Sequence, residues 1–584
     1  MVGGGGGLPL EPDGSEEQGR VAMMFVRAWV LLGGGGWGLA VAQTPTLNQE
    51  PVELPVYTVQ GTVDPLPPES WRYTRIEGFE VLSDGSVAQT RHWVEEFQRF
   101  HHAISLVWPV GQAQRQPPAL LVLCEDSGSY EQLLPKTPRS RGALGYSAGY
   151  QRREHAALVI DFSGRLPETV SATEVLDPGL EGPAQTAGSD IGGVQSDPYR
   201  ALYREYIHLL LSQADPPAPA WFEEGLCQLL ADIRVTDTAI TVGKLDREDS
   251  FADADDPEPT FNLALKSRSL LPLEAMFAPE AGQLTPGGPR DGRWAVQCYA
   301  FVHWGLYGNF GQNQKPFLQF LVQASREPVT EMMFRHHFKR TYKQMLYELK
   351  SYTEISRYKV AGLRTEGREK LPPPAPFAVR EATEAEVGRI KGRVLRLAGR
   401  TSDAREALIA PYRRGVRDTA LLAELGLAEL ERGERERART FLLAATRRET
   451  DQPRAYLELA RILAEDRAAV PDAVPAPHSP VLALLTQAAA RPPPLAEVYA
   501  LMLETWLNGD AFPDTEGFRL LDAGVRAFPG DATLICRLAE LKVRAGAIES
   551  ARSLVAHGLR VLSDPAAKER LRALQLRLPA APPS

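Results

Sequence analysis

Two neighbouring stretches of the chain carry residue types that serve in metal-assisted hydrolysis. The first runs from Arg204 to His208 and contains Glu205, and the second is Trp-Phe-Glu-Glu-Gly-Leu, which includes Glu224. Histidine and carboxylate side chains bind zinc, and a carboxylate beside a metal-bound water can act as a general base. Apolar residues recur at helical spacing around both stretches, so we predict helices over 198–212 and 219–232.

The pair of stretches resembles the pattern of the peptidase-MA-like (gluzincin) zinc peptidases, in which HExxH on one helix is followed by W-x-x-E-G-L on the next. The resemblance covers roughly residues 70–355. It implies that Glu205 is the general base, that His208 is the second metal ligand and that Glu224 is the third.

The sequence departs from this pattern at the position of the first metal ligand. Arg204 stands where the family has its first histidine. A guanidinium is always protonated and has no lone pair for a metal. One histidine and one carboxylate make two protein ligands, whereas catalytic zinc normally has three. We therefore expect no cofactor, or zinc if the protein is active.

The arginine itself suggests a hypothesis for this position. Arg204 and His208 share one helix face at i and i+4, and Glu224 should pack opposite them. Two carboxylates without a metal would leave buried like charges, which is costly. We therefore expect Arg204 to occupy the cation position, neutralising Glu224 and bonding Glu205 as well.

Two alternatives remain open for these residues. A substitute metal ligand could come from another histidine, the candidates being His101, His102, His155 and His303. Alternatively, Glu205 is a helix-surface residue and His208 a half-buried histidine with no role in chemistry, because short motifs match by chance.

A later helix supports the resemblance. The run from Gln297 to His303 is similar to a segment of related bacterial domains that reads roughly Y-x-Q-S-W-x-x-V-H. Cys298 replaces the usual serine, and Ala295 stands where an aromatic hydroxyl is common. Any catalytic help from that hydroxyl in relatives is absent here.

The surrounding elements predict an α+β gluzincin-like (zincin) domain. Patterns of apolar residues indicate strands at 77–83, 118–124, 145–150 and 156–162 and a hairpin at 235–245. They indicate further helices at 87–106 and near 272–278, 292–308, 314–325 and 341–355. Residues 164–196 and 246–260 lack periodicity and are expected to be loop insertions.

The end of the chain has a 34-residue period. Gly392, Ala404 and Leu408 recur 34 residues later as Gly426, Ala438 and Leu442, and a second set (Gly517, Leu521 and Gly524) recurs as Ala551, Val555 and Gly558. Small residues at such a period resemble tetratricopeptide (TPR) repeats, in which helix pairs stack into a solenoid with a groove for protein partners. An irregular helical bundle is the alternative. We expect an all-α TPR-like solenoid over 384–578.

The N-terminus has the features of an export signal. Residues 1–22 resemble an N-terminal extension that results from a start codon assigned too far upstream. From Met23 a basic residue, a short apolar run and an Ala-Val-Ala end at Ala42 follow the order of a signal peptide. The predicted divisions are 1–42 (start and signal peptide), 43–70 (linker), 71–360 (peptidase-like domain), 361–383 (Pro-rich linker) and 384–578 (repeats). We expect an exported, periplasmic or cell-envelope protein with no transmembrane segment in its mature chain.

Charge and cysteine content narrow the function further. The net charge is −9 and no basic stretch stands out, which disfavours a nucleic-acid partner. The four cysteines, whose spacings match no metal or redox motif, are Cys124, Cys227, Cys298 and Cys536. The preferred hypothesis is an exported, catalytically impaired peptidase-like domain with a tail that binds a protein or peptide. The alternatives are an active zinc metallopeptidase with an altered ligand set, and a repeat adaptor with an unrelated α+β head.

Overall fold

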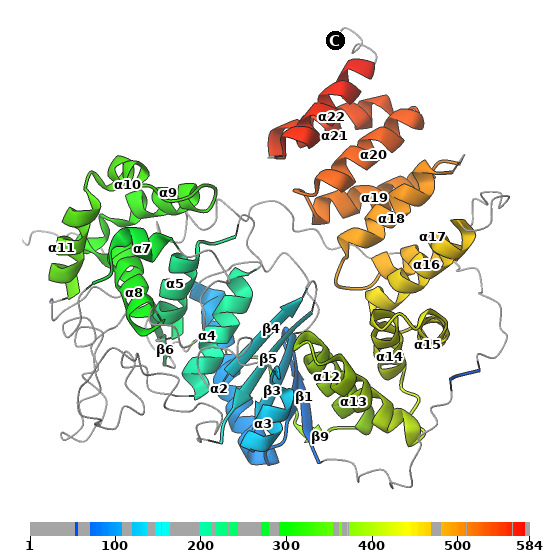
Figure 1. Ribbon diagram of the computed structural model, residues 1–584, viewed down its shortest axis with the longest axis horizontal. Helices are drawn as coiled ribbons and strands as arrows, with labels where there is room; N and C mark the ends of the chain where they lie inside the picture. The colour runs from blue at the N-terminus through cyan, green and yellow to red at the C-terminus, as the bar shows by residue number, and fades with distance from the viewer. Residues whose placement is uncertain are drawn as a thin grey trace, which may run out of the picture.

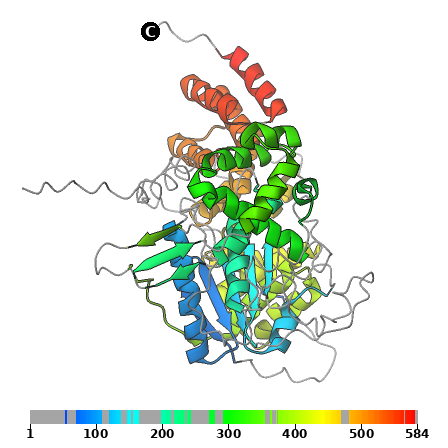
Figure 2. The same ribbon diagram turned by 90° about the vertical axis from the view of Figure 1, so that its left-hand side faces the viewer.

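The computed structural model places a mixed sheet, a lobe of helices and a stack of helix pairs along the chain (Figures 1 and 2). It describes residues 53–55, 70–107, 119–136, 147–152, 155–163, 198–212, 217–231, 233–236, 238–242, 270–278, 291–353, 361–364, 371, 373–468, 480–509, 511–562 and 564–578. The predicted export signal within 1–42 and the insertions 164–196 and 246–260 lie outside these residues. Among the described residues, none of the helices combines the length and the hydropathy that a membrane span requires.

The larger sheet has six strands in the order β4-β5-β3-β2-β1-β9. The strands are β1 (Arg72–Ile76), β2 (Phe79–Ser83), β3 (Ala119–Cys124), β4 (Ser147–Arg152), β5 (His155–Asp161) and β9 (Arg380–Glu381). Strands β2, β3 and β5 are parallel, whereas β4 is antiparallel to β5 and β1 to β2. A two-residue turn joins β1 to β2, and its Gly78 has a positive φ of 77°, which glycine adopts at no steric cost.

Alternating side chains of the sheet are buried against helices on both faces. One face, which includes Val81, Leu121 and Ile160, packs against α2 (Val87–Val107) and α4 (Pro198–Leu211). The opposite face, which includes Leu82 and Val122, packs against α3 (Ser127–Leu133) and α12 (Glu384–Leu397). A strand that is covered on both sides reads as a continuous apolar run, as β3 does.

A lobe of helices follows α4 and continues the same core (Figure 1). It contains α5 (Ala220–Ala231), α7 (Leu273–Phe277), α8 (Asp291–Tyr307), α9 (Gln314–Ala324), α10 (Glu331–Phe338), α11 (Tyr342–Thr353) and the 3₁₀ turn η2 (Asn309–Gly311). A small antiparallel sheet accompanies it, formed by β6 (Arg234–Val235), β7 (Ala239–Val242) and β8 (Ala361–Arg364).

The remaining helices stack one after another up to Arg577, mostly as antiparallel pairs (Figure 1). Beginning with α12, they are α13 (Thr401–Arg413), α14 (Thr419–Glu431), α15 (Arg435–Arg447), α16 (Pro453–Ala468), α17 (Pro480–Ala489), α18 (Ala496–Leu507), α19 (Thr515–Ala527), α20 (Ala532–Arg544), α21 (Ile548–Val561) and α22 (Pro565–Arg577). Side-chain caps fix several of their starts, among them the capping box of Thr383 and Glu386 on α12.

The 34-residue period corresponds to a repeated contact between paired helices. A Cβ on Gly392 would lie 2.6 Å from Leu408 Cγ, and a Cβ on Gly426 would lie 2.7 Å from Leu442 Cγ. The same glycine–leucine contact therefore closes the α12–α13 and α14–α15 pairs, where only glycine allows the approach. This recurrence supports the predicted TPR-like helix pairs at the start of the tail.

The first repeat helix is part of the head as well as the tail. In α12, Ile390 and Val394 are fully buried against the sheet, and Arg389 bonds the Glu80 carboxylate of β2 at 2.8 Å. The segment 361–383, which the sequence suggests is a linker, contains strand β8 at its start and strand β9 near its end. Strand β9 pairs with β1 directly before α12 begins.

Candidate functional site

The candidate site lies where α4 meets α5, beside the edge strand β4. Arg204, Glu205 and His208 project from α4, and Glu224 projects from α5. The helical spacing brings Arg204 and His208 to one face of α4. The structure therefore brings the four predicted residues into the same region, where Arg204 pairs with Glu224 while Glu205 and His208 bond other residues.

Arg204 forms a largely buried ion pair with Glu224. The distance from Arg204 Nη2 to Glu224 Oε2 is 2.7 Å, and the two side chains are 16% and 5% exposed. Gln228 donates from Nε2 to the other Glu224 oxygen at 2.9 Å. Burial would raise the pKa of Glu224, but the Arg204 guanidinium lowers it below its usual value. Glu224 is thus held as a carboxylate by an arginine and an amide.

Glu205 points away from this ion pair towards strand β4. It accepts a hydrogen bond from Ser147 Oγ at 3.1 Å. Its carboxylate also lies against Gly149, where a Cβ would be 2.4 Å from Glu205 Oε2. The hydrogen bond that we expected from Arg204 to Glu205 is not among those formed by the described residues, and the Ser147 hydroxyl takes that place.

His208 is bound to the first turn of α5. Its Nδ1 lies 2.8 Å from Glu223 Oε1, and the two side chains are 28% and 24% exposed. Burial would lower the pKa of His208, but the adjacent Cys227 and the hydrogen bond with Glu223 raise it well above its usual value. In this arrangement Nδ1 of the imidazole is engaged by Glu223.

Helix α8 supports the site from behind. A Cβ on Gly225, which follows Glu224, would lie 2.5 Å from the Cys298 carbonyl oxygen of α8. Gln297 of α8 donates to the Leu271 carbonyl and accepts from the Leu271 N–H. The glycine of the W-x-x-E-G-L stretch thus permits a close crossing of α5 and α8.

Three of the four histidines that could replace the missing ligand have other partners, whereas His102 has a buried Nε2 without a hydrogen-bond partner among the described residues. His303 is fully buried and its Nδ1 lies 2.6 Å from the Tyr352 hydroxyl. His101 stands among the rings of Phe79, Phe97 and Tyr206, and His155 lies close enough to Glu424 of the tail to lower the pKa of that carboxyl. Among the described residues, no three His, Cys, Asp or Glu side chains converge as a metal-binding group.

The zinc that the resemblance implies does not fit the residues present. Both carboxylate oxygens of Glu224 are engaged, one by Arg204 and one by Gln228. The guanidinium places a fixed positive charge at hydrogen-bond distance from the only carboxylate that the pattern offers as a ligand. A dication at this point would be repelled by Arg204, and breaking the ion pair would leave a buried charge uncompensated.

Sequence reasoning missed the partners that hold the predicted residues. Gln228 is four residues after Glu224 and lies on the same face of α5, so helical spacing could have identified it. Glu223 is adjacent to Glu224 and could have been proposed for His208. Ser147 belongs to strand β4, far away in the sequence, and no local pattern indicates its contact with Glu205.

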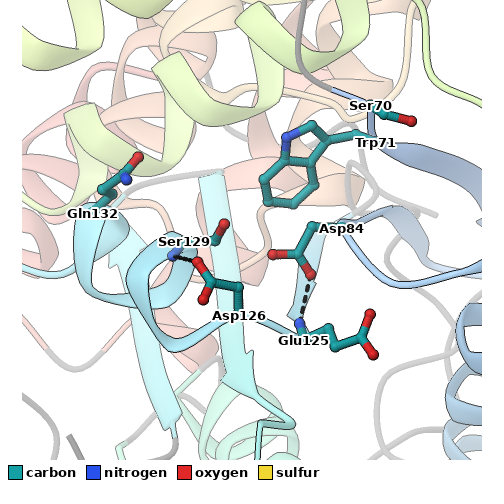
Figure 3. A pocket seen from close by; sticks show the side chains of 7 residues that line it. All are labelled: Ser70, Trp71, Asp84, Glu125, Asp126, Ser129 and Gln132. Atoms are coloured by element: carbon teal, nitrogen blue, oxygen red, sulfur yellow. Dashed lines mark hydrogen bonds between the residues drawn. The ribbon is translucent and has the colours of Figure 1, made fainter.

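A separate cavity of about 500 Å³ opens at the carboxyl ends of β2 and β3 (Figure 3). Its lining residues are Ser70, Trp71, Asp84, Glu125, Asp126, Ser129 and Gln132. None of them belongs to the candidate site. Asp126 accepts from the Ser129 N–H and caps α3, and Asp84 accepts from the Glu125 N–H. These two carboxylates therefore stabilise the backbone where the strands end.

Comparison with known proteins gives structural neighbours for part of the chain. No family model and no curated protein matches the sequence. One similar solved structure is MamA residues 41 to the end from Desulfovibrio magneticus RS-1, with 16% identity over 34% of this chain and 99% of that chain, at a TM-score of 0.23. Another is TTC0263, a thermophilic TPR protein of Thermus thermophilus, with 17% identity over 33% of this chain and 100% of that chain, at a TM-score of 0.22. Because these TM-scores are low, the assignment of TPR-like pairs depends on the repeated contacts within this chain.

Proposed function

We propose that this protein is an exported, non-catalytic relative of the gluzincin peptidases that binds a protein or peptide partner through its TPR-like tail. The observation that supports the loss of catalysis is the ion pair between Arg204 and Glu224. In this proposal the guanidinium substitutes for the metal: it neutralises Glu224, ties α4 to α5 and preserves the fold of the site without its chemistry.

The proposal assigns a role to each predicted site residue. Glu224 and His208, which would be ligands in an active relative, here join α4 to α5 through Arg204 and Glu223. Glu205, the expected general base, accepts from Ser147 and so attaches α4 to the edge strand β4. A carboxylate without a metal-bound water beside it has no nucleophile to activate.

The tail supports the binding part of the proposal. Stacked helix pairs of this kind present an extended surface to which polypeptides bind. The net charge of −9 disfavours nucleic acid as the partner. The export signal and the cell-envelope location remain predictions from the sequence.

A peptidase assay tests the non-catalytic assignment. The full chain, supplied with zinc, is incubated with a library of fluorogenic peptides, and a Glu205→Gln variant serves as the matched control for this site. We expect no hydrolysis above that of the control. Turnover by the natural chain that disappears in the Glu205→Gln variant would establish the active-peptidase alternative instead.

A further inference from the structure

A short segment near the N-terminus lies against the beginning of the tail, far from it in sequence. Leu54 packs against the apolar core of the helix pairs. The carbonyl of the next residue, Pro55, accepts a hydrogen bond from the Tyr412 hydroxyl at 2.8 Å. The segment Glu53–Pro55 therefore contacts the core of the tail through one apolar side chain, and the first repeat through one backbone carbonyl.

The tail holds Tyr412 in a fixed orientation for this contact. Tyr412 lies at the end of α13 and is 2% exposed. The rings of Tyr412 and Phe441 meet edge-on, with 5.4 Å between their centroids. The Arg417 guanidinium lies 3.7 Å from the centroid of the Tyr412 ring. Arg417 is itself bonded to the carbonyls of Tyr412 and Val416. Tyr412, Phe441 and Arg417, which we call the tyrosine site, thus pack together within the repeats.

The chemistry of the segment suits such a site. Proline restricts its own φ and biases the residue before it towards an extended conformation, so less conformational entropy is lost on docking. An extended segment leaves its carbonyls free to accept from a side-chain donor. Leucine adds apolar area to the contact, and the phenol of Tyr412 combines an apolar ring with a hydrogen-bond donor.

We propose that the tyrosine site is a docking site for an extended Leu-Pro segment, and that this chain fills it with its own Leu54 and Pro55. The segment then acts as a strap that ties the N-terminal part of the chain to the first helix pair of the tail. Because an intramolecular ligand is present at high effective concentration, the strap excludes other peptides of the same chemistry from the site.

Binding of a synthetic peptide tests the site. The probe is a fluorescent peptide of residues 49–58, Gln-Glu-Pro-Val-Glu-Leu-Pro-Val-Tyr-Thr, followed by anisotropy with full-length protein. We expect a Leu54→Asp variant, which has lost its strap, to bind the probe at least about tenfold more tightly than the natural chain does. Adding Tyr412→Phe to that variant should weaken binding about three- to tenfold. Equal binding by the natural chain and the Leu54→Asp variant, or no binding by either, overturns the proposal.

Proteolysis provides a second readout that needs no added ligand. We expect a glutamate-specific protease to cleave after Glu53 mainly when the segment has left its site. The Tyr412→Phe variant keeps the ring and removes only the donor, so the fold should persist. We expect several-fold faster cleavage after Glu53 in this variant than in the natural chain. An unchanged rate would show that the hydrogen bond to Pro55 does not hold the strap.

Discussion

At the scale of single residues, one arginine determines what the candidate site can do. Arg204 and Glu224 form an ion pair in a largely buried environment, and Gln228 donates a hydrogen bond to the other oxygen of the Glu224 carboxylate. A buried ion pair adds little net stability over a well-packed apolar pair, but removing one partner is expensive because the other charge remains buried. The pair is therefore best tested by removing one partner and then both.

We predict that Arg204→Met lowers the free energy of unfolding by about 3 kcal/mol, since Glu224 is left without its counter-charge. Adding Glu224→Gln to this variant should restore part of the loss. Urea denaturation followed by tryptophan fluorescence measures both. Arg99→Met is the matched control, because Arg99 is 59% exposed in its pair with Glu96, and a change within about 0.5 kcal/mol is expected. An Arg204→Met effect as small as that of the control would contradict the assigned role.

At the scale of elements, strand β2 and helix α12 are joined by a buried ion pair. Burial would raise the pKa of Glu80, but Arg389, together with the hydrogen bond from Arg75, lowers it to about 2. A carboxyl with a lowered pKa in the folded state stabilises that state above its unfolded pKa, here 4.5. The contribution is lost as the pH falls from about 4.5 towards about 2.

We therefore predict that Glu80→Gln makes the stability of the fold less dependent on pH below about pH 5. The natural chain should lose more stability between pH 5 and about pH 3 than the variant does, because only the natural chain must protonate Glu80 on the way. Thermal unfolding monitored by circular dichroism at each pH gives the comparison. Glu381→Gln, which alters a 74% exposed carboxylate on neighbouring β9, should keep the natural profile. If all three proteins lose stability equally as the pH falls, protonation of Glu80 does not cause the loss.

The elements also show how far the sequence could predict the structure. The strong apolar periods predicted α2, α4, α5 and α8 to within one or two residues, because those helices bury a continuous face. Strand β1 was missed and β2 was predicted to begin at Glu77, where Glu77 and Gly78 form the hairpin turn. Strands β8 and β9 are short and depend on partners distant in sequence. Helix α10, which has eight residues, was not among the predicted helices.

The candidate site was predictable in its membership but only partly in its contacts. The approach of Arg204 to Glu224 follows from charge balance between two adjacent helices, and the structure shows that contact. Glu205 was expected to share the arginine, yet it bonds Ser147 of strand β4. Helical spacing determines which residues share a face, whereas the choice between two possible partners depends on the tertiary position of the edge strand.

At the scale of the whole molecule, the head and the tail share α12. This helix covers one face of the sheet with Ile390 and Val394, while its Gly392 closes the first helix pair on Leu408. Arg393 and Arg396 of the same helix also pair with Glu424 of α14. A helix with apolar contacts on both sides cannot be assigned to either part alone.

We predict that the place of truncation decides whether the isolated head folds. A chain ending at residue 383 lacks α12 and exposes Leu82, Leu120 and Val122, which are fully buried in the intact protein. A chain ending at residue 417 retains α12 and α13. Expression followed by size-exclusion chromatography should yield a soluble monomer for the longer chain and aggregate for the shorter one, since a large exposed apolar patch promotes association. If the two truncated chains are equally soluble, the head does not need α12 in order to fold, and the prediction is wrong.

The central claim is that Arg204 takes the place of the metal, and zinc content tests it most directly. Protein purified without chelator is dialysed against zinc, and zinc per chain is measured by elemental analysis for the natural sequence and for Arg204→His. The account predicts no bound zinc in the natural chain and about one zinc per chain in the variant, because the variant regains a third ligand. A full equivalent of zinc in the natural chain, lost in a His208→Ala variant, would contradict it.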